Sequence, residues 1–189
     1  MDVAVLRSQR VVLRGWKARD SEPFAALNAD PIAMEYFPAP LSRAESDAMV
    51  GRAQAGLEAR GWGWWCLDIE GTCAGFVGLA QPTFEAPFTP CVEVGWRMAT
   101  RFWGMGYATE AARLALDYGF RRIGLAEIVS FTTVANWRSR RLMERLGMRR
   151  DPADDFDHPR IAPGHPLGQH VLYRLVAPNF CMGPATNRP

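Results

Sequence analysis

Gly104 and Gly106 lie in a short loop, residues 101–108, between a strand-like run and a helix rich in small residues. A loop that leads into a helix exposes backbone N–H groups without intrahelical partners, and the helix dipole adds partial positive charge there. Glycine has no Cβ and tolerates positive φ, so its backbone can come close to phosphate oxygens. The spacing therefore predicts a loop that binds a diphosphate.

A dinucleotide-binding turn is the alternative use of such a loop. That turn requires G-x-G-x-x-G, or a small residue in the last place, directly after a strand. Here Thr109 occupies the last place, and residues 99–103 separate the loop from the strand. Glu127 does lie about twenty residues further on, where that motif has its acidic residue. The loop as a whole still fits a dinucleotide site poorly.

The apolar pattern around this loop indicates alternating strands and helices. Ser42 and Glu45 form a capping box that opens a helix, Gly61 ends that helix, and residues 70–72 are typical of a hairpin turn. The expected strands cover residues 10–16, 64–69, 74–80, 91–98, 126–133 and 171–176. The expected helices cover residues 24–28, 43–60, 108–123 and 137–146.

Length and charge limit the class of protein. A chain of 189 residues, 48% of them hydrophobic, can bury one core and is too short to suggest two. The formal net charge is +2 with both signs interspersed, unlike the clustered basic face of a nucleic-acid-binding protein. Residues 1–7 show no secretory pattern, and no apolar run approaches about twenty residues. We expect a cytoplasmic protein that binds neither nucleic acid nor membrane.

Cysteines and histidines do not have the spacing of metal ligands. The four cysteines form no C-x-x-C pair and three lie in strand-like apolar runs, which favours free buried thiols over disulfides or metal ligands. His158, His165 and His170 lack the spacing of a zinc site. We expect no metal.

The spacing Arg-x-x-Gly-x-Gly, with the arginine on the strand side, resembles the acyl-CoA loop of the GNAT superfamily of N-acetyltransferases. Segments 92–96, 104–111, 136–139 and 146–148 are similar to the branch that contains the ribosomal-protein alanine N-acetyltransferases (Rim-type). The order of the expected strands and helices also matches this superfamily, and the resemblance covers residues 10–176.

The resemblance implies a mixed α/β (α+β) fold in a single domain, residues 1–176. The expected sheet is mostly antiparallel, has six to seven strands with a splayed fourth strand, and is flanked by about four helices. Residues 177–189 carry three prolines and little periodicity, so we expect a poorly ordered tail.

Acetyl-CoA is the co-substrate that the resemblance implies. Backbone groups of Trp96 and Met98 are expected to hydrogen-bond the pantetheine arm as an added strand would. Amides of residues 101–108 should hold the pyrophosphate, and Asn136 and Ser139 should face the thiol end. The full set expected at the co-substrate is Trp96, Met98, Arg101, Trp103, Gly104, Met105, Gly106, Tyr107, Ala108, Thr109, Asn136, Ser139 and Arg141.

Two side chains are candidates for the chemistry. Glu93 lies in an otherwise apolar strand, and a carboxylate that points into a cleft has its pKa raised toward that of a useful general base. The alternative is that Glu93 lies on the solvated face of that strand. Ser139 is the candidate for protonating, or hydrogen-bonding, the departing thiolate; a surface serine is the alternative. Many GNAT enzymes use a tyrosine one turn further along, where this chain has Met143.

Loops with aromatic and charged residues are candidates for the acceptor side. Phe37 and Phe84 could form aromatic walls, or simply pack within their loops. Residues 151–160 concentrate acids, and we assign Asp157 and His158 to the acceptor. An acidic loop would attract a cationic acceptor, although such runs are often only solvated.

The function implied is transfer of the acetyl group of acetyl-CoA to a primary amine by direct attack. A single carboxylate suits an α-amine with pKa about 7.8, of which about a third is neutral near pH 7.4, better than a lysine amine with pKa about 10.4. The first candidate for the acceptor is therefore a protein N-terminal amine. The alternatives are a small-molecule amine (an antibiotic or polyamine) and a non-catalytic acyl-CoA sensor. Both a monomer and a homodimer are compatible with the sequence.

Overall fold

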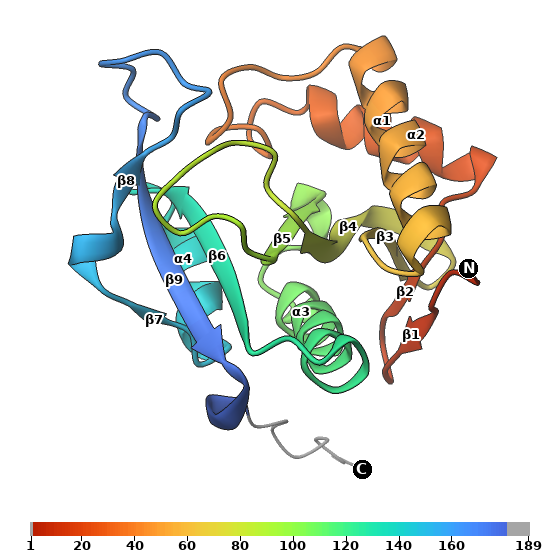
Figure 1. The fold of residues 1–189 in the computed structure, drawn as a ribbon. Coiled ribbons are helices and arrows are strands. Elements are labelled where there is room, and N and C mark those ends of the chain that lie inside the picture. The colour runs from red at the N-terminus through yellow and green to blue at the C-terminus, as the bar shows by residue number, and fades with distance from the viewer. Residues whose placement is uncertain (1, 181–189) are drawn as a thin grey trace.

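The computed structural model describes residues 2–180, which form a nine-stranded sheet with helices on both faces. The strand order is β1-β2-β3-β4-β5-β6-β9-β7, with β8 paired to β9 (Figure 1). The strands are β1 (Leu6–Arg7), β2 (Val12–Arg14), β3 (Trp64–Ile69), β4 (Thr72–Ala80), β5 (Glu93–Met98), β6 (Glu127–Thr133), β7 (Arg149–Arg150), β8 (Phe156–Asp157) and β9 (Gln169–Val176).

Strands β5 and β6 are parallel, whereas the other described pairs are antiparallel. Their register contains the pair Glu93–Val129, with the Val129 N–H donating to the Val92 carbonyl at 2.9 Å. By comparison, six register pairs join β4 to β5. The described sheet therefore opens between β5 and β6 beyond Glu93, which is the splay expected of the fourth strand.

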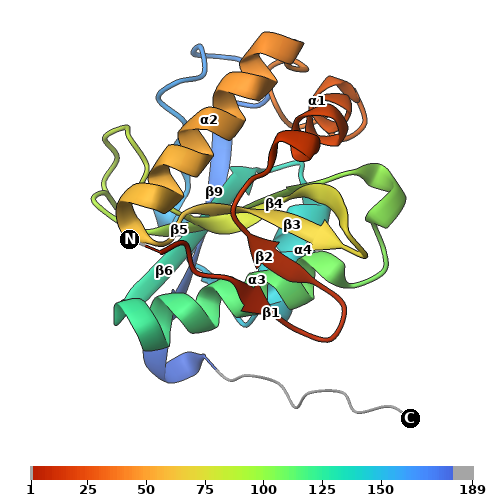
Figure 2. The ribbon, with the colours of Figure 1, turned by 90° about the vertical axis from the view of Figure 1, so that its right-hand side faces the viewer.

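Two helices cover each face of the sheet. Helices α1 (Ser21–Ala29) and α2 (Arg43–Arg60) lie on one face, and α3 (Tyr107–Tyr118) and α4 (Trp137–Arg145) on the other (Figure 2). The small buried residues Ala111, Ala112 and Ala115 let α3 pack closely on β4 and β5. The mixed α/β fold with about four helices is confirmed.

Several local signals in the sequence are confirmed at the residue level. Ser42 accepts a hydrogen bond from the Glu45 N–H while the Glu45 carboxylate accepts from the Ser42 N–H, so the capping box opens α2. Gly61 ends α2 with φ 78°, a conformation that favours glycine. Glu70 and Gly71 both have positive φ in the hairpin turn between β3 and β4.

Some expectations differ from the structure. The sheet has nine strands rather than six to seven, because the two-residue strands β1, β7 and β8 add to its edges. Helix α3 ends at Tyr118 and continues as a π-helical turn, Gly119–Ile123. Of the tail expected to be poorly ordered, Ala177–Asn179 form a 3-10 turn and Phe180 packs on Phe120 with ring centroids 5.2 Å apart. Residues 181–189 of that tail lie outside the described residues.

A buried ion-pair network connects β2 to β3 and to the N-cap of α1. Arg14 donates to Asp20 at 2.6 Å and to Asp68 at 2.8 Å, and both side chains of the Arg14–Asp20 pair are nearly inaccessible. The thiols of Cys66 and Cys73 and a carboxylate oxygen of Asp20 lie within 4.8 Å of one another. Within residues 2–180, no helix is long and apolar enough to cross a bilayer.

Candidate active site

A cavity of about 2160 Å³ runs through the opening between β5 and β6 and reaches both faces of the sheet. On one face it is lined by Trp103, Gly104 and Ser139, near α3 and α4. On the other it is lined by Phe37 and Arg97, near α1 and α2. A passage that joins two faces can hold two reactants that meet in the sheet plane, which is the geometry that group transfer between them requires.

The backbone of β5 presents unpaired groups to this opening. The peptide groups of successive strand residues point alternately to either side, and the Val92 carbonyl points toward β6. The groups of Val94, Trp96 and Met98 therefore point to the same open side. The Met98 carbonyl accepts a 2.7 Å hydrogen bond from the Trp103 indole. The groups of Trp96 and the N–H of Met98 thus face the opening, and their contact with an extended ligand arm stays a prediction.

The glycine loop has the backbone conformation that its sequence requires. Gly104 and Gly106 have φ of 77° and 83°, and Gly106 precedes the first residue of α3. A Cβ built on Gly104 would meet no described atom within 4 Å, so the backbone there faces open space. Ala108 and Thr109, in the first turn of α3, line the cavity, and the N–H groups of a first helical turn have no intrahelical acceptor.

Arg10, which no sequence motif marks, holds this loop in place. Its guanidinium donates to the Met105 carbonyl at 3.0 Å and to the Glu110 carboxylate at 2.7 Å. Glu110 also accepts from Ser8 at 2.6 Å. The turn before β2 thus clamps the glycine loop onto α3 through residues about a hundred positions apart. Sequence spacing carries no signal for such contacts.

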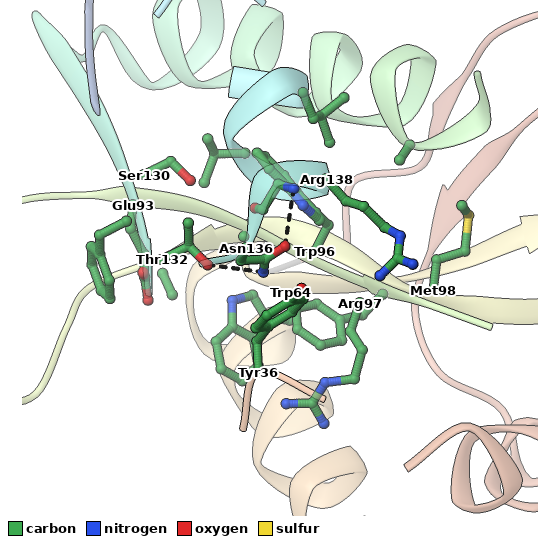
Figure 3. A pocket seen from close by; sticks show the side chains of 18 of the residues that line it. Tyr36, Trp64, Glu93, Trp96, Arg97, Met98, Ser130, Thr132, Asn136 and Arg138 are labelled. Atoms are coloured by element: carbon green, nitrogen blue, oxygen red, sulfur yellow. Dashed lines mark hydrogen bonds between the residues drawn. The ribbon is translucent and has the colours of Figure 1, made fainter. Parts of the chain in front are cut away.

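Glu93 lies at the point where β5 and β6 diverge. It lines the cavity, and Figure 3 shows its side chain directed to the same side of β5 as Arg97. That is the face covered by α1 and α2, because alternate strand residues share a face. Burial raises the pKa of Glu93 to about 7. No hydrogen bond from a described residue reaches its carboxylate, so the group can accept a proton from a ligand.

Helix α4 presents a free hydroxyl to the cavity. Asn136 is its N-cap: the amide oxygen accepts from the Ser139 N–H at 3.2 Å, and the amide nitrogen donates to Thr132 at 3.0 Å (Figure 3). The Ser139 hydroxyl lines the cavity and makes no hydrogen bond among the residues described. Met143 is 1% exposed and packs in the core, so its position faces away from the cavity.

The cavity brings together most of the residues that the sequence assigned to the site, from segments far apart in the chain. Its lining includes Phe37, Phe84, Glu93, Trp96, Met98, Trp103, Gly104, Gly106, Ala108, Thr109, Asn136, Ser139, Arg141 and His158.

Four assigned side chains lie outside this lining. Arg101 is exposed and stacks on Phe102, with 4.7 Å from its guanidinium carbon to the ring centroid. Met105 is 54% exposed, and Tyr107 lies beneath the guanidinium of Arg10. Asp157 is exposed on the edge strand β8. Backbone groups of the first three remain close to the loop, and the assignment of Asp157 to the acceptor stays a prediction.

The acidic segment around residues 151–157 is largely neutralised. Asp155 pairs with Arg150, and Asp154 with Arg174 at 2.7 Å. Asp151 caps a 3-10 turn by accepting from the Ala153 N–H. Asp155 and Asp154 are paired because β7 and β9 bring Arg150 and Arg174 beside them, which the sequence run did not reveal. The segment therefore offers little attraction for a cationic acceptor.

An aromatic wall closes the acceptor side beyond Glu93. Phe84 lies 5.7 Å from Phe131 and 4.7 Å from His158, measured between ring centroids. His170 lies 4.9 Å from His158. Burial, His170 and Arg160 together lower the pKa of His158 to about 4, so that ring is neutral near pH 7. This wall is suited to apolar contact with an acceptor rather than to proton transfer.

Arginines dominate the charged residues of the cavity lining, which the sequence did not predict. Its carboxylates are Glu93 and Glu110, and Glu110 is already paired with Arg10. Arg138 reaches across the cavity rim, where it pairs with Glu35 at 3.2 Å and lies 4.8 Å from the Trp103 ring. The arginines that line the cavity are Arg10, Arg52, Arg60, Arg97, Arg113, Arg138, Arg141, Arg145 and Arg160.

The α3–α4 side of the cavity fits an acyl-CoA. The open loop at Gly104 and the N-terminus of α3 suit a pyrophosphate. Arg113, Arg141 and Arg145 add cations on the same side, where a further phosphate would be stabilised. The open edge of β5 suits an amide-containing arm, and Ser139 lies where that arm would end.

Known proteins resemble this chain over most of its length. A family model described as an acetyltransferase (GNAT) domain matches residues 10–149. The uncharacterized protein YkkB of Bacillus subtilis is 30% identical over 146 residues, which is 76% of this chain and 84% of YkkB.

Two further similarities are to a relative in sequence and to a solved structure. The FsC-acetyl coenzyme A-N(2)-transacetylase of Aspergillus fumigatus is 40% identical over 92 residues, which is 47% of this chain and 39% of that protein. This chain therefore spans well under half of that relative. The solved structure of RimL, a ribosomal L7/L12 alpha-N-protein acetyltransferase in complex with coenzyme A, superposes with TM-score 0.73 at 16% identity. That superposition covers 92% of this chain and 98% of RimL, and it supports the fold.

Proposed function

Because this chain belongs to the GNAT acetyltransferase family and is an acyl-CoA-dependent N-acetyltransferase, we propose that its acceptor is the α-amine of a protein or peptide N-terminus. The observation that supports this acceptor is the position of Glu93, where the two faces of the cavity meet. A carboxylate with a pKa of about 7 matches an α-amine with a pKa of about 7.8. A lysine amine, with a pKa near 10.4, would need a stronger base.

The roles of the side chains follow from their positions. Glu93 accepts a proton from the amine, directly or through water, so that the neutral nitrogen attacks the thioester carbonyl. Backbone N–H groups on the open edge of β5 stabilise the negative charge that develops on the carbonyl oxygen. Ser139 donates a hydrogen bond to the sulfur as the carbon–sulfur bond breaks. The acyl carbon thereby passes from sulfur to nitrogen with no covalent bond to the protein.

A small-molecule amine is the second candidate acceptor. The observation that favours it is the 40% identity to a transacetylase named for an N(2) position, although the match covers only 47% of this chain. The aromatic wall of Phe84, Phe131 and His158 would suit a compact apolar acceptor as well as a peptide side chain.

An acceptor panel separates these candidates. The purified protein is incubated with acetyl-CoA and one amine at a time, and release of the CoA thiol is measured. We expect peptides with a free N-terminus to be acetylated faster than the same peptides with a blocked N-terminus and a free lysine. A higher kcat/KM for the blocked, lysine-only peptide, an aminoglycoside or a polyamine would contradict the N-terminal assignment and leave the fold and co-substrate unaffected.

A further inference from the structure

Arg97 is a cation without a carboxylate partner on the acceptor side of the cavity. It lines the cavity, and no carboxylate of the described residues lies within ion-pair distance of its guanidinium. Burial lowers the pKa of Arg97 to about 10, which still leaves it charged near pH 7. A half-buried charge is costly unless a group of opposite sign compensates it.

Neutral groups hold the Arg97 side chain in position. Its Nη1 donates to the Oδ1 of Asn28 at 2.6 Å, and the amide nitrogen of Asn28 donates to Ser46 at 2.9 Å, so the amide orientation is fixed. The guanidinium carbon lies 4.0 Å from the Phe37 ring centroid and 5.7 Å from that of Phe76. These contacts orient the guanidinium without neutralising its charge.

The donors that remain on Arg97 are not satisfied by the protein. Nε is buried and has no hydrogen-bond partner, and Nη2 makes no hydrogen bond with a residue of the described chain. Buried polar groups in proteins are nearly always paired, so an unpaired donor set in a cavity indicates a ligand. Planar guanidinium donors match the paired oxygens of a carboxylate or a phosphate.

The surrounding charges agree with an anionic ligand. Arg52, Arg60 and Arg160 line the same side of the cavity, whereas Glu93 is the carboxylate of that side among the described residues. The positive groups near α3 and α4 can be compensated by the phosphates of CoA, but those near α1 and α2 cannot. A polycationic acceptor would be repelled here.

We propose that Arg97 binds an oxyanionic side chain of the acceptor, so that the enzyme selects amines with a carboxylate or phosphate near the reacting nitrogen. This subsite rests on the acetyl-transfer function proposed above and names the chemistry of its substrate. Glu93 and Arg97 share one face of β5 and are four residues apart, about 13 Å between Cα atoms. An extended peptide covers that distance in about four residues, so the acidic side chain belongs within the first four positions.

Peptides that differ only in charge test this subsite. The parent peptide is Ala-Gln-Gln-Gln with an amidated C-terminus, and single Glu or phosphoserine residues replace Gln at the second, third or fourth position. We expect the best acidic peptide to exceed the parent in kcat/KM by about ten- to a hundredfold, the usual range for a charge-assisted hydrogen bond. A higher kcat/KM with Glu than with phosphoserine indicates that the subsite prefers a carboxylate, and the reverse order indicates a phosphate.

Variants of Arg97 link this preference to the guanidinium. In Arg97→Gln the ratio of acidic to parent peptide should fall to near one. Arg97→Lys, which keeps the charge and would still be informative if the Gln variant failed to fold, should retain part of the ratio. Arg121→Gln removes an exposed arginine outside the cavity lining and should keep the wild-type ratio. An acidic preference unaffected by both Arg97 variants, or a preference for Lys-containing peptides, would overturn the proposal.

Two small amines distinguish the Arg97 subsite from the proposal that the acceptor is a peptide N-terminus. Glutamic acid α-amide and glutaminamide share the same α-amine environment and differ in the side-chain charge. If no peptide is acetylated but glutamic acid α-amide is preferred in an Arg97-dependent manner, the N-terminal acceptor is wrong and the Arg97 subsite stands. If peptides are acetylated without any acidic preference, the subsite is wrong and the N-terminal acceptor stands.

Discussion

Glu93 and Val129 are paired across β5 and β6, and the two strands separate beyond them. The last backbone pairing between the two strands thus lies at Glu93. The opening beyond it is part of the cavity in which the two reactants would meet. The same divergence leaves the backbone groups of Trp96 and the N–H of Met98 facing the opening, while the Met98 carbonyl accepts from the Trp103 indole. In the proposed mechanism, this one feature of sheet topology would position both the base and the co-substrate.

The glycine loop should be required for co-substrate binding. Acetyl-CoA should raise the melting temperature of the wild-type protein, because a ligand that binds the folded state stabilises it, and NADH should not. Gly104→Val should abolish this rise because it adds a Cβ in the open space where a pyrophosphate would approach the backbone. Gly106→Val should abolish it because the added Cβ would lie 3.4 Å from the Arg10 guanidinium that holds the loop.

Gly124→Val is the matched control for that experiment. Gly124 has φ 79°, close to the 77° of Gly104, and an added Cβ would meet no described atom within 4 Å at either position. Both variants therefore have similar backbone strain, but only Gly104 lies in the loop. Equal acetyl-CoA shifts in the two folded variants would show that the loop does not bind the co-substrate.

The hydroxyl of Ser139 should assist departure of the thiolate. Ser139→Ala should lower kcat by about ten- to a hundredfold, the range for a lost hydrogen bond to a charged group. The defect should persist at high pH, because the missing donor is not replaced by deprotonating the amine. Ser139→Thr keeps a hydroxyl and should retain most of the rate. Equal kcat values for the Ala variant and the wild type would reduce Ser139 to a surface residue.

The buried pair Arg14–Asp20 should control stability at low pH. Burial disfavours the Asp20 anion, but hydrogen bonds from Arg14 and from the Lys17 N–H outweigh this and hold the pKa of Asp20 below its ordinary value. A lowered pKa in the folded state gives stability that is present above the unfolded pKa, about 3.9, and is lost as the pH falls through the folded value.

Asp20→Asn should therefore lower the free energy of unfolding by about 3 kcal/mol at pH 7, because Arg14 loses a buried partner. This difference from wild type, measured by urea unfolding, should shrink as the pH falls below about 3.9. Asp47→Asn breaks an exposed pair with Arg43 on α2 and should leave the free energy of unfolding nearly unchanged. Similar losses for the two variants would contradict the role of the buried network.

Local sequence patterns predicted the elements better than the edges of the sheet. The capping box at Ser42 and the hairpin glycine at Gly71 depend on neighbouring residues, so they can be read from the sequence. The two-residue strands β7 and β8 have no periodicity of their own and form because β9 offers a free edge. Their lengths could not be predicted.

In the candidate site, too, some residues could be predicted from local sequence patterns and others could not. The glycine loop and Glu93 are marked by residue type and spacing, and both line the cavity. Arg10 and Arg97 are marked only by partners distant in sequence, Glu110 and Asn28, so they were missed. Asp157 was assigned from an acidic run in which Asp154 and Asp155 are paired with Arg174 and Arg150. Whether such residues belong to the site depends on tertiary contacts, which residue type and spacing do not reveal.

The pH dependence of Glu93→Gln tests the central claim most directly. In the wild type, kcat/KM with an N-terminal peptide should rise with pH through an apparent pKa of about 7, as the carboxyl loses its proton. In Glu93→Gln, kcat/KM should be lower by about 10² to 10⁴ near neutral pH and should recover above the pKa of the amine, about 7.8, where the acceptor is already neutral. Glu85→Gln, at an exposed loop position outside the cavity lining, should behave as the wild type. A Glu93→Gln enzyme with wild-type kcat/KM across the neutral range would contradict the account, because another group would then be taking the proton.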